Sequence, residues 1–326
     1  MRLAFLFPGQ GSQSAGYLRR LPEHPRVRDT LQEAGELLGV DIVELDQEPA
    51  LRSTVAVQLG LLVAAVAQAR ALAAEDVRPD AVAGLSVGAF GAAVACGCLE
   101  FGDALRLVDL RARSMQQAFA EGYGMLAVSG LRQAALESLL EQLNADPDRT
   151  GAELAPAQRA YLANLNSGSQ FVVAGADAAL ARLADAARGA GARQVERLAV
   201  AVPSHCPLLA GTAAELAGEL GALRLRDPVV PYVANTTARA LHKAAEVARD
   251  LAEGVMRPVR WHDTNRLLVE LGVRCSVEMP PGQALTRFMH NLSCQVDALA
   301  SDGSSLRSLV LRVRRACPQG GATQPT

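Results

Sequence analysis

Hydrophobic residues form short unbroken runs along the chain, and each run is followed by a turn or a helical pattern. Residues 3–7 and 81–85 are two such runs, and continuous apolar runs of this length are typical of parallel strands buried on both faces. Helical patterns rich in Ala occupy 51–74, 89–97 and 101–119. The alternation of strand and helix predicts a parallel sheet covered by helices.

A more compact series of elements begins near residue 126. Its predicted order of strand, helix, two strands, helix and strand is that of a split ferredoxin-like unit, with the elements at 126–128, 134–143, 161–166, 170–174, 177–190 and 194–202. The alternation of strands and helices then resumes, with strands at 229–234 and 276–279 and helices at 244–256 and 264–271.

The resulting prediction is an α/β protein of two parts. A parallel-sheet, hydrolase-like core is formed by 1–125 and 203–317, and an inserted ferredoxin-like βαββαβ subdomain is formed by 126–202. The segment 318–326 is rich in Gly, Gln, Thr and Pro, so we expect it to be disordered.

Composition narrows the possible partners. The chain has 326 residues, half of them hydrophobic, and a net charge of −2 with four Tyr and one Trp, which disfavours a nucleic-acid partner. The longest apolar run, 59–67, is shorter than the ~20 residues that span a membrane. Six Cys follow no disulfide or metal-site spacing, and no secretory signal is apparent, so we expect a cytoplasmic protein without a metal site or membrane contact.

The sequence Gly84-Leu85-Ser86-Val87-Gly88 lies between a predicted strand and a predicted helix. This is the context of a GxSxG nucleophile elbow, in which two Gly permit a sharp turn and the Ser projects at a helix N-terminus that favours a developing oxyanion. A bare GxSxG also occurs by chance. The strand-to-helix context favours the nucleophile.

A nucleophilic Ser needs a general base, and His205 has the best setting of the five His. It lies between Pro203 and Pro207, in a loop after an apolar strand, where a side chain can be held at a cleft. A hydrogen-bonded loop histidine without a catalytic role is the competing interpretation.

Two further features point to the same cleft. The loop Phe7-Pro8-Gly9-Gln10-Gly11 can aim a backbone N–H group into it, although a purely structural turn fits as well. Arg111 lies in a largely apolar helical stretch, where a guanidinium must be paired. It can bind a substrate carboxylate or form a salt bridge with Asp109.

Taken together, ordered motifs across residues 3 to about 290 resemble the malonyl-CoA:acyl carrier protein transacylase family. In chain order they are FPGQGSQ, GLSVG, VDLRARSMQ, YLANLNSGSQFVVAG, VPSHCPLL, PVRW and EMPPGQALT. Several motifs in a fixed order are far more specific than one.

The resemblance implies a role for each matching residue. Ser86 would be the nucleophile and His205 its base, with Arg111 holding the malonyl carboxylate. The remaining matches are Gln10 and Val87 as oxyanion-hole N–H donors, Met115 and Asn166 as pocket residues, and the backbone carbonyl of Arg260 as the group that orients the histidine.

Two residues depart from the family's usual GHSxGE pattern. Leu85 replaces the His and Ala89 replaces the Glu. This variant, with the segment 51–59, looks like the epsilon subunit of bacterial malonate decarboxylase, which loads malonyl onto that enzyme's own carrier subunit.

The expected activity is a ping-pong transfer of malonyl from coenzyme A, through a Ser86 ester, to the phosphopantetheine thiol of an acyl carrier protein. No cofactor is expected beyond these substrates. The carrier would be that of malonate decarboxylase or, alternatively, of fatty acid or polyketide synthesis. A serine hydrolase acting on thioesters and a non-catalytic docking subunit are the competing classes.

Overall fold

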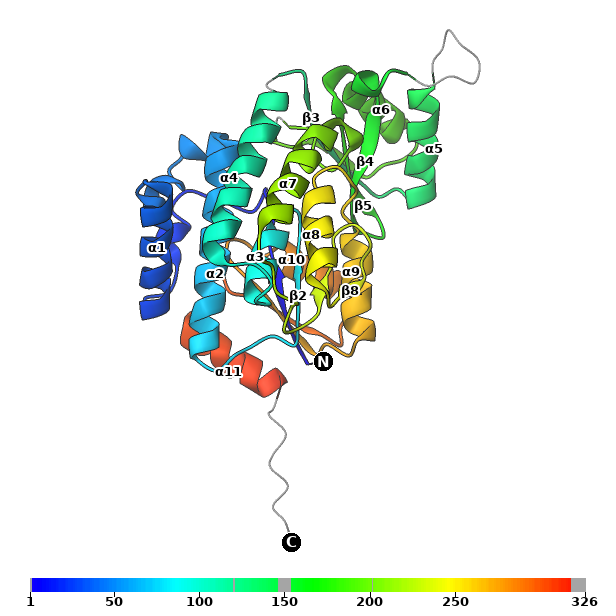
Figure 1. Ribbon diagram of the computed structural model, residues 1–326. Helices are drawn as coiled ribbons and strands as arrows, with labels where there is room; N and C mark the ends of the chain where they lie inside the picture. Colours follow the sequence, from blue (N-terminus) through cyan, green and yellow to red (C-terminus); the bar gives the residue numbers. More distant parts are fainter. Residues whose placement is uncertain (1, 120, 146–153, 201, 318–326) are drawn as a thin grey trace.

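Two β-sheets organise the protein (Figure 1). The computed structural model describes residues 2–119, 121–145, 154–200 and 202–317. The larger sheet has the order β10-β9-β1-β2-β7-β8, and its neighbouring strands run parallel except for the antiparallel pair β7 and β8. Its strands are β1 (Leu3–Phe7), β2 (Ala81–Gly84), β7 (Tyr232–Val233), β8 (Ala240–Leu241), β9 (Cys275–Glu278) and β10 (Asp297–Ala300).

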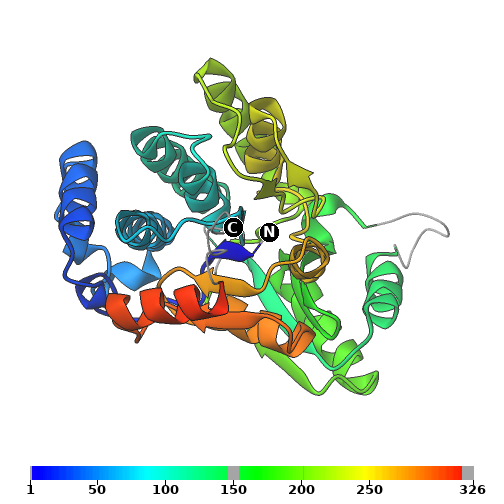
Figure 2. The ribbon, with the colours of Figure 1, turned by 90° about the horizontal axis from the view of Figure 1, so that it is seen from below.

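Helices cover both faces of this sheet because its central strands are apolar on both faces. In β1, Phe5 and Phe7 pack into one hydrophobic cluster, whereas Ala4 and Leu6 pack into another on the opposite face. The first cluster is built with α1 (Pro25–Leu38), α2 (Thr54–Ala74), α3 (Gly88–Ala95), α4 (Phe101–Ala118), α7 (Ala210–Ala222), α8 (Ala244–Glu253) and α11 (Leu306–Ala316). The second is built with α9 (Trp261–Glu270) and α10 (Ala284–Leu292), so α10, in orange, lies across the sheet from α4 in Figure 2.

Helix α2 is long and apolar enough to cross a membrane, but it is a core helix of this protein. In its most apolar stretch, 89% of the residues are buried inside the protein, and the helix packs against α1, α3 and α4. Its burial on all sides explains why its hydrophobic residues surround the whole helix.

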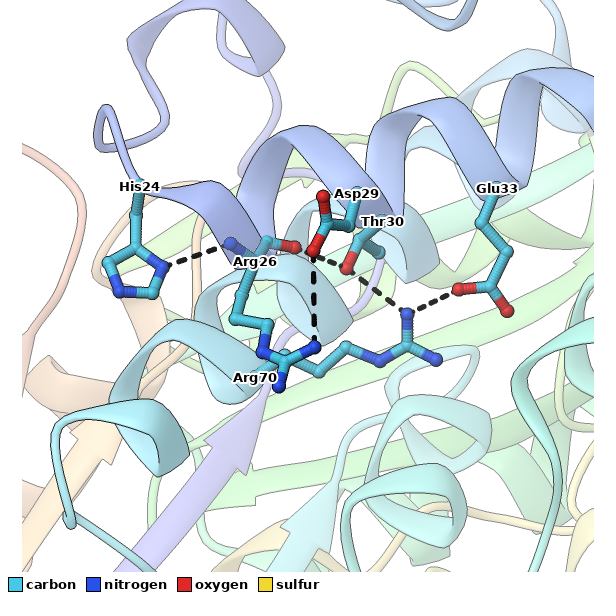
Figure 3. A network of polar contacts seen from close by, with 6 residues as sticks. All are labelled: His24, Arg26, Asp29, Thr30, Glu33 and Arg70. Atoms are coloured by element: carbon cyan, nitrogen blue, oxygen red, sulfur yellow. Dashed lines mark hydrogen bonds and ion pairs between the residues drawn. The ribbon is translucent and has the colours of Figure 1, made fainter.

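Polar contacts hold α1 against α2 (Figure 3). Arg70 on α2 donates hydrogen bonds to Glu33, at 2.5 Å, and to the hydroxyl of Thr30, at 3.1 Å. His24 caps the N-terminus of α1 by accepting a hydrogen bond from the backbone N–H of Arg26. These contacts place α1 at the outer edge of the helical layer (Figure 1).

The inserted subdomain has the predicted βαββαβ order. Its antiparallel sheet has the strand order β4-β5-β3-β6 and its own hydrophobic cluster. The elements are β3 (Tyr123–Ser129), α5 (Gln133–Asn144), β4 (Ala160–Ser167), β5 (Gln170–Ala176), α6 (Asp177–Gly189) and β6 (Gln194–Arg197).

The predicted limits of this subdomain need adjustment. Tyr123 already pairs with Ala176, so the boundary at 126 cuts through β3, and β6 ends at Arg197 rather than at 202. The strand predicted at 229–234 is limited to Tyr232–Val233. The segment 318–326 lies outside the described residues.

The inserted subdomain contacts the core beside the carboxyl ends of β1 and β2, through Val259 in the segment before α9. Asn164 of β4 forms a parallel bridge with Val259, whose N–H donates to the carbonyl of Ala163 at 2.8 Å. This contact fixes the insert next to the loops that follow β1 and β2. Ligands of open parallel sheets bind at this edge.

Candidate active site

Ser86 occupies a strained turn between β2 and α3. Its φ angle is +57°, in the left-handed region that a residue with a side chain rarely adopts. The flanking glycines make the turn possible: a Cβ atom on Gly84 would lie 2.2 Å from the backbone of Gly88, and one on Gly88 would lie 2.2 Å from the carbonyl oxygen of Phe7. The structure therefore has the geometry of a nucleophile elbow.

His205 lies next to this serine, as predicted. Its Nε2 atom is 2.8 Å from Ser86 Oγ, and its side chain is buried. Nδ1 lies 2.6 Å from the carbonyl oxygen of Gly254, which requires a proton on Nδ1 and leaves Nε2 free to accept the serine proton.

The prediction that the Arg260 carbonyl orients His205 is wrong. That carbonyl accepts the backbone N–H of Thr264 in the first turn of α9, and the Arg260 side chain pairs with Asp263. The orienting group is the carbonyl of Gly254, at the C-terminal end of α8. A backbone carbonyl does the task, but it comes from a position six residues earlier in the sequence.

Arg111 is buried and reaches the same serine. It extends from α4, and Nη2 donates to Ser86 Oγ at 3.1 Å. The alternative salt bridge to Asp109 does not form, because Asp109 pairs with the exposed Arg113 at 2.7 Å. Among the described residues, no carboxylate lies within ion-pair distance of Arg111. Its charge is therefore available to an anionic ligand.

Gln58 supports Arg111 and was not identified from the sequence. Its Oε1 accepts a hydrogen bond from Arg111 Nη1 at 2.5 Å, and its Nε2 donates to Gln10 Oε1 at 3.3 Å. The same Nε2 approaches the sulfur of Met115 at 3.8 Å. A Gln within the apolar first half of helix α2 was the available signal, since buried polar side chains need partners.

Burial and charge set the protonation states at this site. Burial is the main factor that lowers the pKa of His205, to about 3, and the nearby charge of Arg111 lowers it further, while hydrogen bonds to the Gly254 and Arg257 carbonyls oppose the shift. Burial also lowers the pKa of Arg111, to about 10. At neutral pH the imidazole is neutral and the guanidinium is charged.

A cavity of about 520 Å³ opens onto Ser86 and His205 between the core and the inserted subdomain. Asn166 lines it as predicted, and among the described residues its buried Oδ1 has no hydrogen-bond partner. Met115 is not among the residues that line this cavity; its sulfur contacts Gln58 Nε2 at 3.8 Å. Pockets at such junctions are typical binding sites.

The two departures from the usual elbow motif occupy different environments. Leu85 lines the cavity, so an apolar side chain replaces an imidazole on its wall. Ala89 is buried in the core on α3, where a Glu side chain would need a polar partner. Both residues change the surroundings of Ser86 and leave its contact with His205 in place.

Gln10 and Val87 are the residues expected to supply the oxyanion donors. Gln10 lies in the cavity-lining loop after β1, and Val87 is the N-cap residue of α3. Within the described part of the chain, neither backbone N–H donates a hydrogen bond. Both groups are thus free to bind a developing negative charge.

The sequence of this chain matches a known family of proteins. The model of the acyl transferase domain family matches residues 4–310. The chain is 36% identical over 306 residues to a malonyl CoA-acyl carrier protein transacylase of Haemophilus influenzae, covering 92% of this chain and 95% of that protein.

Solved structures of transacylases are similar to this fold over almost the whole chain. A malonyl CoA-acyl carrier protein transacylase from Coxiella burnetii superimposes with a TM-score of 0.88 at 33% identity, covering 97% of this chain and 98% of that chain. A malonyl-transacylase in complex with its type II polyketide acyl carrier protein superimposes with a TM-score of 0.87 at 33% identity, covering 97% of this chain and 100% of that chain.

Proposed function

This chain belongs to the acyl transferase family, and we propose that it moves a malonyl group from coenzyme A to the phosphopantetheine thiol of an acyl carrier protein. The observation that carries this proposal is the buried guanidinium of Arg111, 3.1 Å from Ser86 Oγ and without a carboxylate partner in the described residues. A buried cation is unfavourable unless it is paired. The free carboxylate of a malonyl group bound to Ser86 supplies the missing partner.

In the first half-reaction, His205 Nε2 takes the proton of the Ser86 hydroxyl, from 2.8 Å, as Oγ attacks the malonyl thioester carbonyl. The negative charge on the carbonyl oxygen is stabilised by the N–H groups of Val87 and Gln10. The C–S bond then breaks, and the leaving thiolate of coenzyme A takes the proton from the imidazolium. A malonyl ester of Ser86 remains.

The second half-reaction reverses these roles with a different thiol. His205 takes the proton of the carrier's phosphopantetheine thiol, and the sulfur attacks the ester carbonyl. The bond to Ser86 Oγ breaks, and the serine regains its proton from the imidazolium. No step requires a metal or cofactor, and no separate carboxylate is needed, because the Gly254 carbonyl orients the histidine.

The relatives favour a carrier protein of fatty acid or polyketide synthesis. Those compared above are described as malonyl CoA-acyl carrier protein transacylases or as the transacylase of a type II polyketide carrier. The malonate decarboxylase pathway rests only on the Leu85 and Ala89 variant and the segment 51–59, so we rank it second. Either pathway is consistent with a cytoplasmic enzyme.

The test is intact-protein mass spectrometry of the enzyme mixed with malonyl-CoA and then with a phosphopantetheinylated carrier protein. We expect a malonyl adduct on the wild type that disappears as the carrier gains the group, and no adduct on Ser86→Ala. Absence of both adduct and carrier loading would leave only a docking role.

The same experiment separates the remaining alternatives. Release of free malonate at the rate of transfer identifies a hydrolase. Parallel reactions with a fatty-acid carrier, a polyketide carrier and a malonate decarboxylase carrier subunit compare the pathways directly. Preferential loading of the decarboxylase subunit would reverse the ranking given above.

A further inference from the structure

One helix, α8, is connected by hydrogen bonds to both Ser86 and His205. The carbonyl of Gly254 at its end binds His205 directly, and Asp250 binds Asn235, which in turn binds the backbone of Ser86. The carboxylate of Asp250 and the carbonyl of Gly254 lie one turn apart on it, joined by the hydrogen bond from Gly254 N–H to the Asp250 carbonyl at 2.8 Å. We propose that Asp250 and Asn235 are positioning residues for acyl transfer, fixing Ser86 relative to His205 through this helix. The inference rests on the proposed role of Ser86 as the nucleophile.

Asn235 bridges the two sides of the elbow. Its Oδ1 accepts the backbone N–H of Ser86 at 3.0 Å, and its Nδ2 donates to the carbonyl of Gly84 at 2.7 Å. With the amide flipped, the Asn235 NH₂ group would face the Ser86 N–H, and the amide oxygen would face the Gly84 carbonyl oxygen. These two contacts therefore fix the orientation of the side chain. A strained residue such as Ser86 costs about 1–3 kcal/mol and persists only where its surroundings hold it. The Asn235 bridge is such a restraint.

Asp250 in turn fixes the segment that carries Asn235. Its Oδ2 accepts the N–H of Asn235 at 3.0 Å and the hydroxyl of Tyr232 at 2.8 Å. Its Oδ1 accepts the N–H and the hydroxyl of Thr236, at 3.0 and 2.7 Å. Four donors from a five-residue segment thus converge on one buried carboxylate. In the described residues this carboxylate has no ion-pair partner, so these four hydrogen bonds hold it in the interior.

The C-terminal end of α8 fixes the base. The Gly254 carbonyl accepts His205 Nδ1–H at 2.6 Å, and the next carbonyl, that of Val255, accepts the His205 backbone N–H at 2.8 Å. His205 itself has a left-handed φ of +64°, so its loop also needs such restraint. The 2.8 Å contact between serine and histidine therefore depends on where α8 lies.

The Asn235 side chain also determines which backbone N–H group can bind the oxyanion. The N–H of Ser86 is committed to Asn235, whereas the N–H of Val87 is not committed within the described residues. Loss of the bridge would release the Ser86 N–H and let the turn relax. Both changes slow attack on the substrate without removing any group that binds it.

The test compares Asp250→Asn with Asp46→Asn. The first replaces one carboxylate oxygen by an NH₂ group that faces donors, which disturbs the segment holding Asn235. The second makes the same chemical change at a buried carboxylate whose hydrogen bond, from the backbone N–H of Leu18 at 2.6 Å, involves none of Ser86, His205 and Asn235. Both variants are expected to melt at a lower temperature than the wild type, so the control separates lost stability from lost positioning.

The main readout is the labelling rate of Ser86 by a fluorophosphonate probe. In this reaction Oγ displaces fluoride from phosphorus while the proton passes to His205, so labelling needs the aligned pair but no malonyl pocket. We expect Asp250→Asn to label about 10- to 100-fold more slowly, as small displacements of reacting groups do. Its kcat for malonyl transfer should fall equally, with KM within about twofold of the wild type. Asp46→Asn should label at the wild-type rate.

Labelling of folded Asp250→Asn at the rate of Asp46→Asn would overturn the proposal. If Asp250→Asn does not fold, Asn235→Ala carries the test, since it removes the bridge directly. The same slow labelling with little change in KM is expected, and an unchanged rate rejects the proposal. A wild type that labels rapidly but transfers no malonyl group would reject the proposed function and leave the positioning role intact.

Discussion

Arg111 and His205 both lie within hydrogen-bond distance of the same hydroxyl oxygen, Ser86 Oγ. Arg111 Nη2 lies 3.1 Å and His205 Nε2 lies 2.8 Å from Ser86 Oγ, so the charge of the guanidinium acts on the imidazole at short range. That charge lowers the pKa of His205, in addition to the larger effect of burial. An anion bound to Arg111 would remove this second effect. Substrate binding and the basicity of the histidine are thereby linked.

This link predicts a difference between two pH profiles. The acid limb of kcat/KM reports the free enzyme, in which the His205 pKa is about 3, whereas that of kcat reports the substrate complex. With malonyl-CoA, whose carboxylate neutralises Arg111, the kcat limb should lie at higher pH than the kcat/KM limb. Steady-state transfer measured from pH 8 down to the acid limit of folding checks this.

Acetyl-CoA provides the matched control for that experiment. It lacks the carboxylate and leaves the charge of Arg111 in place. Its two profiles should therefore show no such separation. Coincident limbs with malonyl-CoA would contradict the link between Arg111 and His205.

Arg111→Ala should relax the choice of acyl group. Losing a charge-assisted hydrogen bond removes about 1.5–3 kcal/mol, so the preference for malonyl over acetyl should fall about tenfold to a hundredfold. The measurement is the ratio of kcat/KM for malonyl-CoA and acetyl-CoA. Arg113→Ala is the control, because Arg113 is an exposed arginine of the same helix whose pair with Asp109 contributes little. Unchanged malonyl preference in Arg111→Ala argues against the assignment.

Gly88→Ala should destabilise the elbow itself. A Cβ atom at this position would lie 2.2 Å from the Phe7 carbonyl oxygen, a backbone atom that cannot move without displacing β1. Forcing such a contact costs about 1–3 kcal/mol or more, which lowers the unfolding midpoint in denaturant. At Gly218 on α7 an added Cβ meets nothing within 4 Å, so Gly218→Ala should gain up to about 1 kcal/mol. Equal stability of the two variants would show that the turn relaxes freely.

The elements that depend on a short contiguous stretch of sequence could be predicted. The strand Leu3–Phe7 has the predicted bounds because a short apolar run closed by Pro8-Gly9 is typical of a strand that is buried on both faces and ends in a turn. The elbow at Ser86 followed from its two glycines and its place between strand and helix. The βαββαβ insert was predicted from its element order, although its first and last strands were misplaced by a few residues.

The supporting residues of the site were not predictable, because they act across long sequence distances. Asn235 meets Ser86 across 149 residues, and Gln58 meets Arg111 across 53, with no local motif to mark either contact. The backbone carbonyl that orients His205 cannot be recognised in the sequence at all, since every residue has a carbonyl group. Only the position of α8 selects Gly254 over Arg260.

The buried histidine also makes the fold sensitive to acid. The pKa of His205 is about 3 in the folded protein and about 6.5 in an unfolded chain, so between these values the unfolded state binds the extra proton. Stability that is fully present above pH 6.5 is thus lost as pH falls toward 3, by at most about 1.4 kcal/mol per pH unit from this group. His205→Gln removes the titration, so its unfolding free energy should decline less steeply over this range. Parallel denaturant titrations at several pH values check this; equal slopes would mean that other groups dominate.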